Sequence, residues 1–159
     1  MKLSHFDDEG KARMVDVTGK EVTHREAAAS AKISMKPETL RLIADRKVTK
    51  GDVFGVARVA GIMAAKRTPD LIPMCHPLNI SSVAIDFSVD DNKSEVGITA
   101  TVRVAGQTGV EMEALVAVSV AALTVYDMCK SVDREMAISE IMLLRKSGGK
   151  SGEFKRKKA

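Results

Sequence analysis

Residues 83–104, VAIDFSVDDNKSEVGITATVRV, decide the fold of this 159-residue chain. Apolar side chains occupy every second position on both sides of the turn-prone stretch Asp90 to Lys93. A period of two is typical of strands that bury one face, and Asp and Asn favour tight turns. The stretch therefore predicts a β-hairpin.

The flanking sequence predicts two more strands and the helices that cover the sheet. From Arg25 to Met35 apolar residues again alternate, which indicates a strand despite the helix preference of alanine. Pro37 suits a first helical turn, and Asp52 can cap a second helix. The order of elements predicts an α+β ferredoxin-like sandwich, a four-stranded antiparallel sheet with helices packed on one face. The flanking segments are strands over 25–35 and 136–145 and helices over 37–44, 52–67 and 110–132.

Composition is that of one globular domain over residues 1–159, with 45% hydrophobic and 29% charged residues. The net charge of +4 equals the contribution of the basic run Lys155 to Lys158, in a tail (residues 147–159) that we expect to be flexible. Two cysteines and no apolar leader favour the cytoplasm. The longest uncharged apolar run, Ala114 to Tyr126, is shorter than the roughly 18 residues of a membrane span, so no membrane partner is predicted.

Charged residues bracket that apolar run, with Glu111 and Glu113 before it and Asp127 and Lys130 after it. Ionisable groups are costly to bury unless they are paired or used, so this pattern suggests a working site. Asp127 and Lys130 are neighbours on a helix, but Glu113 lies roughly 21 Å away along the axis at about 1.5 Å per residue. A small substrate that meets both ends needs a second copy of the chain. The alternative is a helix whose charged ends suit its dipole, which leaves Asp127 unexplained.

The loop Leu71 to Leu78 holds Cys75 and His76 between two prolines. In an extended segment neighbouring side chains point to opposite sides, so we do not expect the two to form a nucleophile and base pair. Cys75 is interpreted as a packed small residue and His76 as functional, the alternative being a loop histidine bonded to the backbone. The three histidines and two cysteines of the chain show no zinc-ligand spacing, so no metal site is predicted.

Gly148 to Ser151 does not form a nucleotide phosphate loop, because Leu144 occupies the position of the first glycine in that motif. Lys146 follows directly on the last predicted strand and is the best placed residue of this segment to contact a phosphate. The alternative is a solvated tail, which we favour for Lys150 and the residues after it.

Five motifs at these spacings together resemble the molybdenum cofactor biosynthesis protein C family over nearly the whole chain. Met74 and Ser131 stand where Leu and Ala are more usual in that family. The motifs are KGDV at 50–53, DLIPMCHPL at 70–78, GVEMEAL at 109–115, YDMCK at 126–130 and KSGGKSG at 146–152.

The resemblance implies conversion of 3',8-cyclo-7,8-dihydroguanosine 5'-triphosphate to cyclic pyranopterin monophosphate with release of diphosphate. It also implies a homohexamer, a trimer of dimers, with sites at the dimer interface and no resident cofactor; whether Mg²⁺ accompanies the triphosphate is left open. By the same resemblance Lys50 and Lys130 transfer protons, with Asp127 as the acid beside Lys130. Substrate binding falls to Met74, Cys75, His76, Glu111, Met112 and Glu113, to Arg25, Lys66 and Lys146 for the triphosphate, and to Asp16 as a supporting residue.

Two rival interpretations belong to other classes of protein. Ferredoxin-like sheets can bind RNA by stacking bases on exposed aromatic side chains, but Phe87 is the only aromatic residue of the central strands and shares a face with Val83 and Ile85. No nucleic-acid partner is therefore predicted. A protein that serves only as an assembly scaffold is the second rival, but that interpretation gives no role to Asp127 or His76.

Overall fold

A computed structural model describes residues 5–45, 48 and 51–157. Five strands and four helices are assigned over these residues, in an order that matches the predicted one apart from a short helix and a short strand. The elements are β1 (Thr23–Ser34), α1 (Pro37–Ala44), α2 (Val53–Lys66), α3 (Thr68–Leu71), β2 (Ile80–Asp90), β3 (Glu95–Gly106), α4 (Glu111–Cys129), β4 (Ala137–Ser147) and β5 (Phe154–Lys155).

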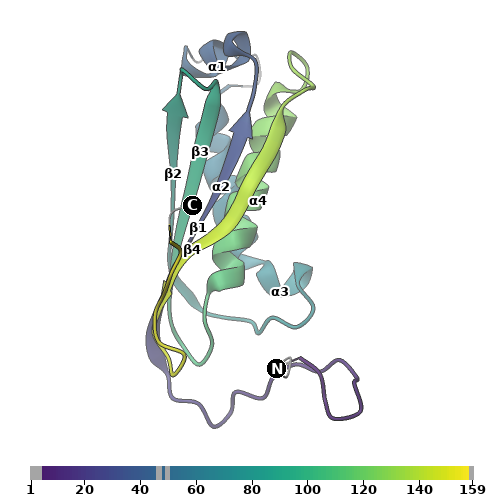
Figure 1. The fold of residues 1–159 in the computed structure, drawn as a ribbon, viewed down its shortest axis with the longest axis vertical. Coiled ribbons are helices and arrows are strands. Elements are labelled where there is room, and N and C mark those ends of the chain that lie inside the picture. Colours follow the sequence, from purple (N-terminus) through teal and green to yellow (C-terminus); the bar gives the residue numbers. More distant parts are fainter. Residues whose placement is uncertain (1–4, 46–47, 49–50, 158–159) are drawn as a thin grey trace.

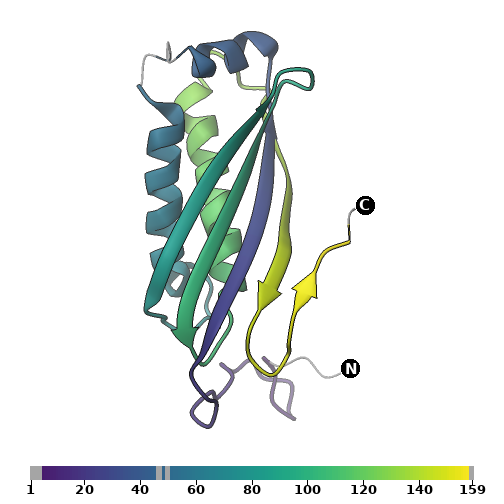
Figure 2. The same cartoon turned by 90° about the vertical axis from the view of Figure 1, so that its left-hand side faces the viewer.

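The strands form one antiparallel sheet in the order β2-β3-β1-β4-β5. Helices α2 and α4 lie side by side on one face of it (Figures 1 and 2). The first four strands have the ferredoxin-like order, which confirms the predicted fold class. β5 is a fifth strand that pairs Phe154 with Lys146, so these tail residues have a place at the sheet edge. The flexibility of the remaining tail stays a prediction.

The predicted hairpin has the register that places both apolar rows on the helix side of the sheet. The row on β3 is buried, whereas on the edge strand β2 Ile85 is buried and Val89 is exposed. Ile85 pairs with Ala100, and Phe87 pairs with Ile98. The ring of Phe87 stacks on Phe54 of α2 with 4.7 Å between centroids. Phe87 therefore packs under a helix, although β2 is an edge strand of the sheet and not a central one.

Small residues bring α4 close to α2 and to the sheet. The alternating alanines of β1 are fully buried, as are Ala117 and Ala121 on α4. At Gly61 of α2 an added Cβ would stand 2.8 Å from the carbonyl oxygen of Ala117 and would collide with the side chain of Ile85. Packing at this helix contact therefore requires glycine, which has no side chain, at position 61.

Gly61→Ala is expected to destabilise the fold by about 1–3 kcal/mol, the usual cost of overpacking a filled core. The comparison is Gly19→Ala, because a Cβ at Gly19 meets nothing within 4 Å. Urea unfolding of both variants measures the difference. Equal midpoints for the two variants would show that the α2–α4 contact accommodates the added methyl group without loss of stability.

Helix α4 ends at Cys129, three residues before the predicted end. The reason is a turn in which the N–H groups of Val132 and Asp133 both donate to the carbonyl of Cys129. Asp133 is 2% exposed, and its carboxylate accepts from the N–H of Lys36 at 2.8 Å and the hydroxyl of Thr39 at 3.2 Å. Burial raises the pKa of this carboxyl, but its hydrogen bonds lower the pKa by more, so the pKa lies below the usual range. The helix end is thereby fixed to α1.

By length and composition alone, α4 is long and apolar enough to cross a membrane. More than half of it is buried inside the protein, however, against α2 and strands β1, β3 and β4. Burial of this kind is what the central helix of a sandwich requires.

The face of the sheet opposite the helices is charged. Glu26 accepts hydrogen bonds from Arg103 and Arg145 on the two neighbouring strands. Lys32 contacts Glu140 at 2.9 Å and Glu95 at 3.4 Å. These pairs let the open face lie against water or a polar partner.

Candidate active site

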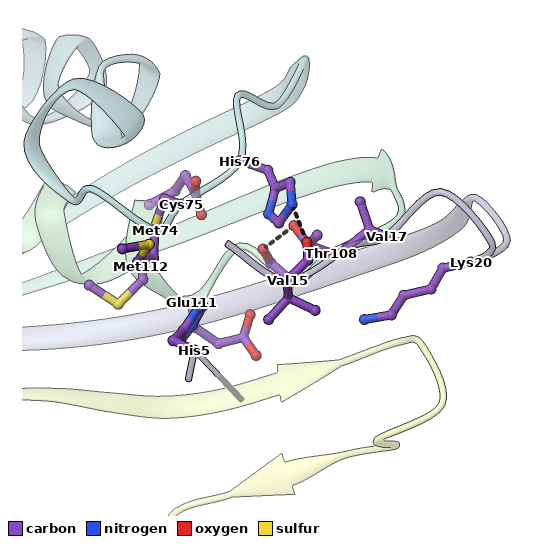
Figure 3. A pocket seen from close by; sticks show the side chains of 12 residues that line it. His5, Val15, Val17, Lys20, Met74, Cys75, His76, Thr108, Glu111 and Met112 are labelled. Atoms are coloured by element: carbon purple, nitrogen blue, oxygen red, sulfur yellow. Dashed lines mark hydrogen bonds between the residues drawn. The ribbon is translucent and has the colours of Figure 1, made fainter. Parts of the chain in front are cut away.

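A cavity of about 370 Å³ opens beside the first turn of α4. Three segments distant in sequence line it: the N-terminal arm (residues 5–22), the loop before β2 and the start of α4 (Figure 3). Met74, Cys75, His76, Glu111, Met112 and Glu113, all predicted to bind substrate, line this one cavity.

Cys75 and His76 both line this cavity, but the hydrogen bond given for the His76 ring goes to the Val15 carbonyl and not to Cys75. The chain turns just before the pair, where the Cys75 N–H donates to the Ile72 carbonyl at 3.1 Å. Burial, with the nearby charge of Glu113, raises the pKa of the Cys75 thiol. The residue is therefore a protonated thiol at neutral pH and not a thiolate nucleophile.

The ring of His76 lies against the N-terminal arm. Its Nε2 is 2.8 Å from the carbonyl oxygen of Val15, which makes Nε2–H the donor of this bond (Figure 3). The next residue, Asp16, accepts from the N–H of Thr18 at 2.9 Å and from its hydroxyl at 2.7 Å, and these bonds lower the pKa of the Asp16 carboxyl. Asp16 thus shapes the arm where it meets His76.

Two carboxylates at the start of α4 have different environments. Glu113 is 3% exposed, and burial together with the charge of Glu111 raises its pKa to about 6. Glu111 is half-buried and lies 3.7 Å from the ammonium of Lys146. One carboxylate is therefore able to gain or lose a proton near neutral pH while the other is held beside a cation.

Glu113→Gln is expected to stabilise the protein in a pH-dependent way. The folded-state pKa of about 6 exceeds the ordinary 4.5, so folding favours protonated Glu113. Its contribution to the free energy of unfolding is complete below pH 4.5 and is lost as the pH rises through about 6. Denaturant unfolding should therefore show a larger gain from the substitution at pH 7.5 than at pH 4.5. The same gain at both pH values would show that folding does not raise the pKa of Glu113.

A second cavity, of about 480 Å³, adjoins the first. It is lined by Arg25 and by the glycine-rich loop after β4, and Lys20 lines both cavities. The Nε–H of Arg25 donates to the carbonyl of Gly106 at 2.8 Å. Gly149 has a φ of 73°, and a Cβ there would collide with the Arg25 guanidinium, so only glycine lets the loop approach. This arrangement places the Arg25 guanidinium at the wall of the cavity, where an anion can bind it.

Lys146 links the two cavities. Its ammonium contacts Glu111 of the first cavity and donates to the hydroxyl of Ser151, which lines the second. Lys66 ends α2 as an exposed residue and is not among the described residues that line either cavity. Its predicted role stays a prediction.

The predicted proton-transfer residues lie at the other end of α4. Lys130 forms a 2.6 Å ion pair with Asp127, and this hydrogen bond and charge raise the pKa of the Lys130 ammonium. Neither residue is among the described residues that line the two cavities. Lys50 lies outside the described residues. Since α2 and α4 run antiparallel (Figure 2), the start of α2 lies at the same end of the molecule as the end of α4, which directly precedes Lys130.

Comparison with known proteins agrees with this arrangement of motifs. The model of the MoaC family matches residues 14–149. The chain belongs to the MoaC family. Its similar relatives are named cyclic pyranopterin monophosphate synthase. They include proteins from Pelotomaculum thermopropionicum (63% identical, 98% of this chain and 91% of the relative), Thermoanaerobacter sp. (60%, 98% and 99%) and Roseiflexus sp. (61%, 96% and 96%).

Apart from Asp16 and Gly109, which belong to the family resemblance, the sequence of this MoaC family chain did not lead us to the arm or to the loop before α4. His5, Val15, Val17 and Lys20 line the first cavity from the arm, and Thr108 lines it from the loop. Signals for them were present: a turn at Thr18-Gly19-Lys20, and a Gly-Gln-Thr-Gly loop directly before the helix with the carboxylates. The period of apolar residues could not show that the arm folds back over the site.

Proposed function

We propose that this chain is a cyclic pyranopterin monophosphate synthase that acts at a site built from two copies of the chain. The main observation behind this proposal is that α4 places Glu111 and Glu113, predicted to bind substrate, at its first turn, and Asp127 with Lys130, predicted to transfer protons, at its end. Substrate is 3',8-cyclo-7,8-dihydroguanosine 5'-triphosphate, and the products are cyclic pyranopterin monophosphate and diphosphate. The products together contain the atoms of the substrate, so no oxidant or reductant is consumed.

The two adjoining cavities suit the two ends of that substrate. Glu111 and Glu113 offer acceptors for the N–H groups of a guanine-derived ring, and Arg25 and Lys146 offer donors for phosphate oxygens. Opening the base and closing a new ring onto sugar carbons break and form covalent bonds, and each change requires a proton to be given or taken, for which a neighbouring chain would supply Lys130 with Asp127. The ion pair keeps Lys130 protonated, which favours it as the acid of these steps.

A homo-oligomer is supported by an exposed apolar stripe on α2. Val56, Val59 and Met63 recur at helical spacing with exposed fractions of 47%, 58% and 49%, and Leu123 of α4 is 57% exposed. We propose the trimer-of-dimers hexamer of the family resemblance, in the cytoplasm, where Cys75 and Cys129 are thiols and not a disulfide. No resident cofactor is proposed, and any Mg²⁺ would arrive with the triphosphate.

The rival RNA-binding function lacks its platform in the part of the chain that the structure describes. Phe87 stacks on Phe54 of α2, and the open face of the described strands β1 and β3 carries charged pairs and no Phe, Tyr or Trp. Base stacking on the central strands is the step that such modules require.

Turnover by the purified protein tests the proposed function. Incubation with the cyclic dihydroguanosine triphosphate should release one equivalent of diphosphate for each pterin product formed. Protein that binds the substrate but releases no diphosphate would contradict the proposal. Salt-sensitive retention of RNA without turnover would favour the rival function instead.

A further inference from the structure

The turn that follows α4 carries Lys130, and backbone hydrogen bonds hold it to the end of the helix. The N–H of Lys130, the C-cap residue, donates to the carbonyl of Tyr126 at 2.8 Å. The N–H groups of Val132 and Asp133 both donate to the carbonyl of Cys129, at 2.9 and 3.1 Å. Lys130 therefore sits in a closed turn that ends at Asp133.

Asp133 is a buried carboxylate with donors from two distant parts of the chain. Its Oδ2 accepts from the N–H of Lys36 at 2.8 Å and from the hydroxyl of Thr39 at 3.2 Å. Its Oδ1 accepts from the N–H of Glu135 at 3.1 Å. Because only 2% of Asp133 is exposed, removal of one of these partners leaves a polar group unpaired in a buried place, which is costly.

The donors Lys36 and Thr39 belong to the start of α1, and this helix is anchored in the core. Leu40 and Ile43 are buried, and α1 lies at the end of the molecule where α4 ends (Figures 1 and 2). The N-cap residue Lys36 makes no capping bond with its own side chain, and the Asp133 carboxylate accepts from its N–H instead. That donor is a backbone group, so the side chain of Lys36 is not part of this link.

The position of the Lys130 ammonium depends on this turn. The side chain is half-exposed, and its ion pair is with Asp127, one helical turn earlier on the same helix. An ammonium on a long flexible stem with little packing around it is placed first by its own backbone. Movement of the turn therefore moves the ammonium.

We propose that Asp133 is a positioning residue for the reaction, which holds the turn that carries Lys130 against α1 and so places the Lys130 ammonium for proton transfer. The inference rests on the proposed function for the reaction and for the role of Lys130. Asp133 is buried, and its two oxygens accept from the three donors described above. It acts through Lys130 and does not itself touch the substrate.

Asp133→Asn is expected to lower kcat roughly ten- to hundredfold, the scale at which a displacement of about 1 Å acts on a catalytic group. Asparagine has one side-chain oxygen in place of two, so it loses either the bonds from α1 or the bond from Glu135. The change in KM should be smaller, because the residues predicted to bind substrate lie at the other end of α4. Steady-state kinetics with the cyclic dihydroguanosine triphosphate separate the two constants.

Asp90→Asn is the matched control for this substitution. The Asp90 carboxylate also fixes a turn, the one between β2 and β3, by accepting from the N–H of Lys93 at 3.1 Å. Its kcat should stay near that of the unchanged protein. Equal kcat values for Asp133→Asn and Asp90→Asn would overturn the proposal.

Thr39 offers a milder pair of variants if Asp133→Asn does not assemble. Thr39→Val removes the hydroxyl that donates to Asp133 and keeps the branched shape, whereas Thr39→Ser keeps the hydroxyl. Thr39→Val should lower kcat, by less than Asp133→Asn, and Thr39→Ser should retain most of the activity. The same kcat for both variants would contradict a catalytic role for this link.

A double-mutant cycle separates positioning from a general loss of stability. In the Lys130→Ala background Asp133→Asn should lower kcat little further, since it acts through Lys130. A substitution that only weakens the fold would lower the residual activity by the same factor in both backgrounds. Effects on kcat that simply multiply would therefore overturn the proposal.

Amide hydrogen exchange tests the inference apart from the proposed function. The N–H groups of Lys130 and Val132 are bonded to carbonyls of α4, and Asp133→Asn should speed their exchange roughly tenfold or more, the scale of one lost hydrogen bond to a charged group. Asp90→Asn should leave this exchange unchanged. Equal exchange in Asp133→Asn and the unchanged protein overturns the role of Asp133, whatever the activity. Faster exchange in a protein that never turns over the cyclic nucleotide would refute the synthase and leave Asp133 as the residue that fixes this turn.

Discussion

Lys130→Ala should lower kcat by roughly 10²-fold or more, the scale of losing a general acid or base. The side chain is 52% exposed and paired with Asp127, so its removal disturbs little packing while it removes the cation at the end of α4. Lys50→Ala is expected to have the same effect. Steady-state kinetics with the cyclic dihydroguanosine triphosphate measure the loss in kcat. A measurement of the oligomeric state shows whether the variants still assemble.

Lys36→Ala is the matched control for this substitution. Lys36 is also 52% exposed and forms an ion pair of 2.7 Å with Glu135, yet no motif of the site includes it. Its kcat should stay near that of the unchanged protein. A Lys130→Ala enzyme as active as the Lys36→Ala enzyme would remove Lys130 from the proton-transfer chemistry.

The fold could be predicted because its signals are local. Alternation from Val83 to Val104 fixed which faces of β2 and β3 are buried, and the Asp52 carboxylate caps α2 by accepting from the N–H of Gly55 at 3.0 Å, as its position suggested. The end of α4 was missed by three residues because it depends on Asp133, whose hydrogen bonds to Lys36 and Thr39 join residues almost 100 positions apart in the sequence. β5 was missed because two residues carry no periodic signal.

Local patterns could predict the candidate site only where its residues are close in sequence, and Arg25 and Lys146 were assigned to it through the family resemblance. Cys75 with His76 and Glu111 with Glu113 stand in short motifs, and the structure brings these two pairs to one cavity. The arm contributes through long-range contacts, such as the one between Val15 and His76, that composition does not encode. Helix geometry, by contrast, predicted correctly that Glu113 and Asp127 lie at opposite ends of one helix.

Glu113→Ala and Lys130→Ala should each be nearly inactive alone and should complement each other when mixed. In the proposed dimer the start of α4 from one chain lies near the end of α4 from the other, so each site uses Glu113 from one chain and Lys130 from its neighbour. A mixed dimer then contains one site with both defects and one site with neither. Random pairing in a two-fold interface gives activity in at most about a quarter of all sites.

The direct measurement of this two-chain site is diphosphate release by the two variants after they are denatured together and refolded as mixed oligomers. Unchanged protein taken through the same refolding sets the full value, and each variant refolded alone sets the background. The expected result is recovery to about a quarter of the full value. Mixed oligomers that contain both variants and stay at background, while the unchanged protein recovers, would contradict a site shared between chains.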